Sequence, residues 1–157
     1  MDLWQVGAVW LHTVAFVIAW GYYGIVGRFV SPALGPAVGP EREAATLLEI
    51  ERRALPFVLL TVVLFTLTGS YLLVTDDRYQ GLGDFGTTWA QLMLAKHVLV
   101  VLLVVLGVFV DRLVRAASGA ASADDRATAL HRLRLATEAA TAVGALIALL
   151  TAASQAV

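Results

Sequence analysis

Two adjacent ionisable residues, Lys96 and His97, lie inside a long apolar stretch of this sequence, and Lys96 is its only lysine. A lysine at the centre of a membrane helix costs roughly 2.5–3.5 kcal/mol even on the mildest scale, and crossing a bilayer requires no such residue. An ionisable group in this position therefore indicates a functional site by default. His12, in the first apolar stretch, is the next candidate, because neutral imidazole is the commonest metal ligand in proteins.

His12 and His97 are predicted to lie at a similar depth in the membrane. His12 follows Leu3 by nine residues and His97 follows Trp89 by eight, which places them about 14 Å and about 12 Å along helices that run in the same direction. Two such imidazoles can ligate a haem iron from opposite sides or hold a bare metal ion. Lys96 and His97 differ by about 100° around their helix, so one could ligate while the other meets a haem propionate or a substrate.

Two further features fit a bound metal or ring. Met93 lies one helical turn before His97, and a thioether together with imidazole suits copper. Gly21, Gly24 and Gly27 recur at every third position of the first stretch. A glycine ridge of this kind lets another helix or a flat ring approach the backbone closely, and it also permits a homodimer.

Each candidate has a structural alternative. His12 could simply hydrogen-bond between helices, and the glycine ridge could serve only helix packing. Lys96 could extend its ammonium toward the outer surface. Glu138 lies four residues after Arg134 near the start of the last apolar stretch, which predicts an ion pair between them. A proton-binding role on the cytoplasmic side is the alternative for Glu138.

The elements that position these residues are predicted to be membrane-spanning helices. The sequence is 59% hydrophobic and only 15% charged, whereas an average soluble domain has about 25% charged residues. Four stretches are each long enough to cross about 30 Å of hydrocarbon. They are Leu3–Phe29, Ala54–Val74, Trp89–Val110 and Leu135–Ala156.

The predicted fold class is all-α: an integral membrane four-helix bundle that runs up-down-up-down. Residues 1–157 are expected to form a single four-helix transmembrane domain with helices at about 3–29, 41–74, 88–115 and 125–155. The segment 31–40 is expected to break the helix, because it carries proline and glycine at high density. The absence of cysteine excludes disulfides and thiolate metal sites, and the lack of a basic patch excludes nucleic acid as a partner.

Arginine placement predicts the orientation. Every arginine except Arg78 flanks the first or the third connection between the apolar stretches. The positive-inside rule then places both termini outside the cytoplasm. The expected location is the cytoplasmic (inner) membrane of a bacterium or archaeon, with the chain crossing the lipid bilayer several times.

Several short motifs spread over the chain point to a family. They are Trp10-Leu11-His12, Trp20-Gly21 and Arg28 in the first stretch, Gln91–His97 in the third, and Arg132-Leu133-Arg134 with Glu138 at the fourth. These motifs resemble the four-helix membrane domain of CopD-like copper-resistance proteins and of the related HemJ-type protoporphyrinogen oxidases. The resemblance implies either haem b bound with His12 and Lys96 involved, or a role in copper uptake across the inner membrane.

The leading hypothesis from the sequence is a membrane b-type haem protein, similar to a cytochrome b. His12 would be one axial ligand and His97 or Lys96 the other. Such a protein would transfer electrons or act as an oxidoreductase on a small membrane-soluble reductant, with a redox partner in the membrane or periplasm. Because a translocation path needs ligands at several depths, clustering at one depth favours a fixed cofactor.

Two alternatives remain open. A copper-binding or copper-uptake protein of the CopD type would use His12, His97 and Met93 as metal ligands. A structural subunit of a larger membrane complex would use the same polar residues only to join helices.

Overall fold

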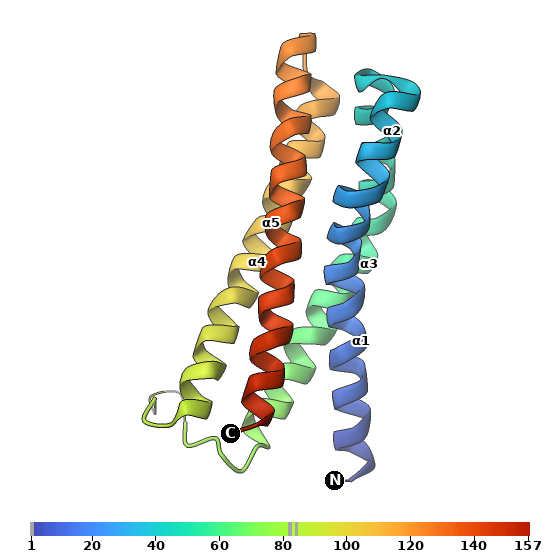
Figure 1. Ribbon diagram of the computed structural model, residues 1–157. Coiled ribbons are helices and arrows are strands. Elements are labelled where there is room, and N and C mark those ends of the chain that lie inside the picture. The colour runs from blue at the N-terminus through green and yellow to red at the C-terminus, as the bar shows by residue number, and fades with distance from the viewer. Residues whose placement is uncertain (1, 82, 84) are drawn as a thin grey trace.

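The computed structural model describes residues 2–81, 83 and 85–157, and in this part of the chain every regular element is a helix. The elements are α1 (Leu3–Ile25), the π-helical turn η1 (Val26–Val30), α2 (Ser31–Val38), α3 (Pro40–Val74), α4 (Thr88–Gly119) and α5 (Ala123–Gln155), as Figure 1 shows. Four continuous helical segments are long and apolar enough to cross a membrane. They are Leu3–Val38, Pro40–Val74, Thr88–Gly119 and Ala123–Gln155. The predicted all-α membrane fold is therefore confirmed.

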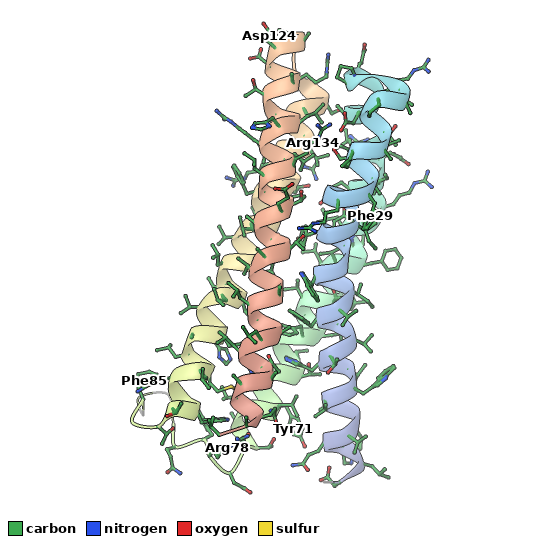
Figure 2. All side chains as sticks on the ribbon, viewed as in Figure 1. Phe29, Tyr71, Arg78, Phe85, Asp124 and Arg134 are labelled. Carbon is green, nitrogen blue, oxygen red and sulfur yellow. The ribbon has the colours of Figure 1, made fainter. Side chains whose placement is uncertain are left out.

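The helices form an elongated bundle in which both termini lie at the same end (Figure 1). We call this the terminal end, and the opposite end, where α2 lies, the arginine-rich end. Figure 2 labels Arg78 and Tyr71 near the terminal end and Arg134 and Asp124 toward the other. The orientation of the termini in the membrane stays a prediction from arginine placement.

Pairs of helices pack unequally. The most extensive contacts join α4 to α5 and α1 to α3, and smaller ones join α1 to α5 and α3 to α4. Fully buried apolar side chains such as Leu47, Val110 and Leu133 lie toward the arginine-rich half. Many leucines and valines on the outer faces are exposed, as helices that face lipid require.

The expected break at 31–40 is wrong for most of that segment. The first helix continues through η1 into α2 and ends only at Gly39, whose φ of 80° suits glycine. Pro32 lies in the first turn of α2, which follows η1 directly, so its missing N–H removes one hydrogen bond from this continuous helix. Pro36 lies inside the helix, and contacts with other helices hold this segment in place.

A buried carboxylate joins α2 to α3 and α5. Glu43 is only 2% exposed and accepts hydrogen bonds from the Ser31 hydroxyl (2.7 Å) and from Nη2 of Arg134 (3.0 Å). Gly35 makes room for it, because a Cβ there would lie 2.7 Å from a carboxylate oxygen of Glu43. A buried charge requires such pairing. The predicted Arg134–Glu138 ion pair is therefore wrong: Arg134 pairs with Glu43, and the exposed Glu138 makes no ion pair among the described residues.

Arg78 fastens the α3–α4 connection to the end of α5. Its guanidinium donates to both carboxylate oxygens of Asp76 (2.9 Å each) and to the carbonyl oxygens of Val157 (2.8 Å) and Ser154 (3.2 Å). It also lies 5.1 Å from the ring centroid of the buried Trp89, at cation–π distance. The lone arginine of the terminal end therefore holds three chain segments together and satisfies carbonyls at the C-terminus of α5.

Acid should weaken the ion pair between Arg78 and Asp76. Hydrogen bonds from Arg78 hold the pKa of the Asp76 carboxyl below its ordinary value of 3.8, although partial burial opposes the shift. A carboxyl whose pKa is lower in the fold than in the unfolded chain stabilises the fold above that ordinary value, and the stabilisation is lost as the pH falls through the folded pKa. Because exposed pairs contribute about 0.2–1 kcal/mol, we expect only local opening, seen as a change in Trp89 fluorescence below about pH 4.

The variants Asp76→Asn and Asp77→Asn test this expectation. Asp76→Asn should show the acid-form fluorescence already at neutral pH, with no further change on acidification. Asp77 is exposed, so Asp77→Asn should titrate like the wild type. Equal titration in all three proteins would contradict the assignment to Asp76.

Candidate metal site

Contacts with α3 fix the orientation of His12 on α1. Its ring stacks on Phe65, with centroids 4.1 Å apart and an angle of 19° between the planes. Its Nδ1 lies 3.1 Å from the Phe65 carbonyl oxygen and 3.1 Å from Oγ1 of Thr68. Gly69 leaves space for the ring, because a Cβ there would lie 2.8 Å from Cε1 of His12. A carbonyl can only accept, so Nδ1 carries the proton and Nε2 keeps a free lone pair.

His97 on α4 has the same arrangement within its own helix. Its Nδ1 donates to the carbonyl oxygen of Met93 over 2.6 Å, which leaves Nε2 as the free nitrogen. The side chain of His97 is exposed rather than packed in the core. Metal-ligating histidines almost always donate their other ring N–H to a carbonyl or carboxylate, which fixes the ring and raises its basicity. Both histidines therefore meet the usual precondition of a metal ligand.

The two histidines and Lys96 line one cavity of about 260 Å³ in the terminal half of the bundle. Helices α1 and α4 both contribute to this cavity, and the remaining wall comes from α3 and α5. Much of that wall is polar: Thr13, Thr66, Ser70, Thr151 and Gln155. The polar lining and the two free imidazole nitrogens make this cavity the candidate site.

Lys96 is half-buried in the wall of this cavity. Its ammonium makes no ion pair among the described residues, but the charge of Asp76 attracts it from the α3–α4 connection. It also lies within electrostatic range of His12. The positive charge of Lys96 therefore opposes any cation held by the histidines.

Met93 lines a neighbouring cavity rather than the one that contains His12. This second cavity has a volume of about 250 Å³ and is lined by Met93, His97, Trp89, Arg78 and residues of the α3–α4 connection. His97 belongs to both cavities. The ligand set predicted from the sequence is therefore divided, with Met93 on one side of His97 and His12 on the other. Within the described residues no cluster of three or more histidine or acidic side chains could hold a metal.

The glycine ridge packs against α5 over most of its length. A Cβ at Gly24 would meet Thr141 at 3.8 Å, and a Cβ at Gly27 would collide with the buried Thr137. Gly21 has nothing within 4 Å of its Cβ position. At Gly24 and Gly27 the ridge therefore serves the packing of α1 against α5, which is the structural alternative given above.

A second polar cluster, which the sequence did not reveal, joins α1 and α3. Glu51 is 4% exposed and accepts a hydrogen bond from the Tyr22 hydroxyl. Glu51 lies in the charged segment that precedes Pro56, and such a segment is typical of a helix face exposed to solvent. A signal was present, however, because Glu43, Leu47 and Glu51 recur every four residues and so share one helix face, which the structure buries. Arg28, another candidate from the sequence, is exposed and makes no ion pair among the described residues.

Comparison with known proteins adds one finding. Residues 48–154 match the family described as CopD, copper resistance protein D. No curated protein and no solved structure gives a significant match. The matched range includes Met93, Lys96, His97 and Glu51, and it begins after His12.

Proposed function

This chain belongs to the copper resistance protein D family, and we propose that it binds copper inside the membrane and takes part in copper uptake. The observation that carries the proposal is the pair of imidazoles, His12 and His97, which line one cavity and each keep Nε2 free. Imidazole and thioether ligands suit copper. The expected location is a bacterial cytoplasmic membrane with the termini outside, so that the cavity belongs to the extracytoplasmic half.

The two cavities suggest the order in which copper would move. We call the cavity lined by Met93 and His97 the outer cavity and the one lined by His12 and His97 the inner cavity. The ion would bind first to Met93 and His97 in the outer cavity, and His97 would then share it with His12 in the inner cavity. The sequence alone placed all ligands at one depth, which favoured a fixed cofactor. Two adjoining cavities with one common histidine favour a moving ion instead.

The charge of Lys96 fits a site that releases its ion. A cation between the two histidines is repelled by the ammonium, so its binding is weaker than two imidazoles alone would give. Permeation requires sites that bind an ion well enough for entry and weakly enough for exit. A monovalent Cu⁺ is repelled half as strongly as Cu²⁺ at the same distance, so the proposed cargo is Cu⁺.

Titration of the purified protein with Cu⁺ against a coloured chelator tests the proposal, with an absorption spectrum of the same sample. We expect about one Cu⁺ per chain, and His97→Ala should abolish binding because His97 belongs to both cavities. His131→Ala is the matched control, since His131 is exposed at the arginine-rich end. Absence of copper binding, or equal loss in both variants, would refute the proposal. A haem spectrum that His97→Ala removes would favour the haem hypothesis, which no finding supports so far.

A further inference from the structure

Glu51 is a buried carboxylate that the proposed copper route does not use. It lies on α3, is 4% exposed, and is joined to α1 by the hydroxyl of Tyr22, which donates to its carboxylate. Tyr23, the next residue of α1, lies within electrostatic range of Glu51, and the rings of the two tyrosines meet edge to face with centroids 5.4 Å apart. A group buried this deeply, with one neutral partner, requires an explanation beyond the packing of helices.

The charges around Glu51 leave it without a counter-ion. The charges of Asp111 and Arg115, both on α4, act on Glu51. Arg115 forms an ion pair with Asp111 through three hydrogen bonds of 2.8–3.0 Å, and both of these side chains are partly exposed. No titratable side chain of α5 contacts Glu51 among the described residues. Two carboxylates within electrostatic range of each other and of a single arginine do not both ionise without a cost in free energy, and the arginine already pairs with Asp111.

A narrow apolar cavity adjoins the cavity of His12 and His97 and is also lined by Tyr23. It has a volume of about 50 Å³ and shares Phe65, Thr66 and Val100 with the cavity of His12 and His97. The side chains that line this small cavity are almost all apolar, so they screen charge poorly, and a cation at the histidines raises the electrostatic potential at Glu51.

We propose that Glu51 is a proton-binding site, and that its proton leaves when a monovalent cation binds at His12 and His97. The O–H bond of the Glu51 carboxyl breaks, and the proton passes to water at the arginine-rich end, beside the partly exposed Asp111. One positive charge enters as one leaves, and no electron moves. The identity of the cation rests on the proposed function, whereas the presence of the proton does not.

Infrared spectroscopy of the full-length protein without copper tests the proton site. The wild type should show the carbonyl stretch of a protonated carboxylic acid near neutral pH, and Glu51→Gln should lose it. Glu49→Gln is the matched control, because Glu49 lies on the same helix but is exposed and paired with Arg53. Tyr22→Phe should shift the band, since the hydroxyl that bonds to Glu51 is removed. A band that is absent from the wild type, or that survives in Glu51→Gln, would overturn the proposal.

Proton release on addition of Cu⁺ tests the coupling. A pH-indicator dye in weakly buffered solution should report proton release by the wild type and by Glu49→Gln. Glu51→Gln should release about one proton fewer per bound copper than the wild type does. Equal release by Glu51→Gln would overturn the coupling. If the wild type binds no copper, the proposed function and the coupling both fail, while the infrared band still decides whether Glu51 holds a proton.

Discussion

Replacing His12 with alanine should weaken Cu⁺ binding by more than roughly 100-fold, because groups that merely orient a ligand already contribute about 10–100-fold. His12 supplies one of the two free imidazole nitrogens in the inner cavity, and its loss leaves a single histidine beside Lys96. The protein should still fold, since the side chain is only half-buried. Chelator competition measures the affinity, and vesicle uptake of copper measures transport.

A milder variant separates a ligand role for His12 from a packing role. Thr68→Val keeps the shape of the side chain but removes the oxygen that lies 3.1 Å from Nδ1 of His12. Because Phe65 still accepts from the same nitrogen, we expect a loss of about tenfold or less. If His12→Ala binds copper as tightly as the wild type, or if Thr68→Val has the larger effect, His12 is a structural residue and the proposed site is wrong.

Gly144→Ala should be strongly destabilising although it adds a single methyl group. The indole of Trp20 from α1 lies directly against Gly144 on α5, where a Cβ would collide with three ring atoms. Moving the ring would also break the 2.9 Å hydrogen bond from its N–H to the carbonyl oxygen of Thr141. Overpacking costs about 1–3 kcal/mol and a lost hydrogen bond about 1 kcal/mol more, which exceeds the helix preference of alanine over glycine. Thermal unfolding in detergent measures the change.

Gly21→Ala is the matched control for this variant. Gly21 lies on α1 with nothing within 4 Å of its Cβ position, so alanine should be neutral or stabilising by up to about 1 kcal/mol. A destabilisation equal to that of Gly144→Ala would show that Gly21 contacts something outside this chain, such as a second copy. A neutral Gly144→Ala would contradict the close packing of Trp20 on α5.

Hydropathy predicted the spans well and their ends less well. The cost of placing polar backbone in lipid forces each long apolar stretch into a helix, so four spans follow from the sequence. The segment 31–38 was misjudged because local helix breakers were weighed without the contacts that hold it. Ser31 donates a hydrogen bond to Glu43, and Glu43 also pairs with Arg134, which is distant in the sequence. Local helix propensities do not include such long-range contacts.

The candidate site was predicted in part. Equal spacing from the span ends placed His12 and His97 at similar depth, because the rise per residue of a helix is constant. They do line one cavity, together with Lys96. The rotation of each helix about its axis depends on packing partners, which no periodic pattern specifies. For that reason Met93 was grouped with His12, although it lines the neighbouring cavity.

The sequence by itself determined that this protein is a membrane bundle of four long helices with rare nitrogen donors at one depth, since hydrophobic length and helix rise are properties of the chain alone. Only the tertiary structure decided which nitrogen of His12 is free, which glycines face α5, and that Glu51 is buried beside Tyr22. These outcomes depend on side chains that meet across helices, so they are fixed when the helices pack and not before.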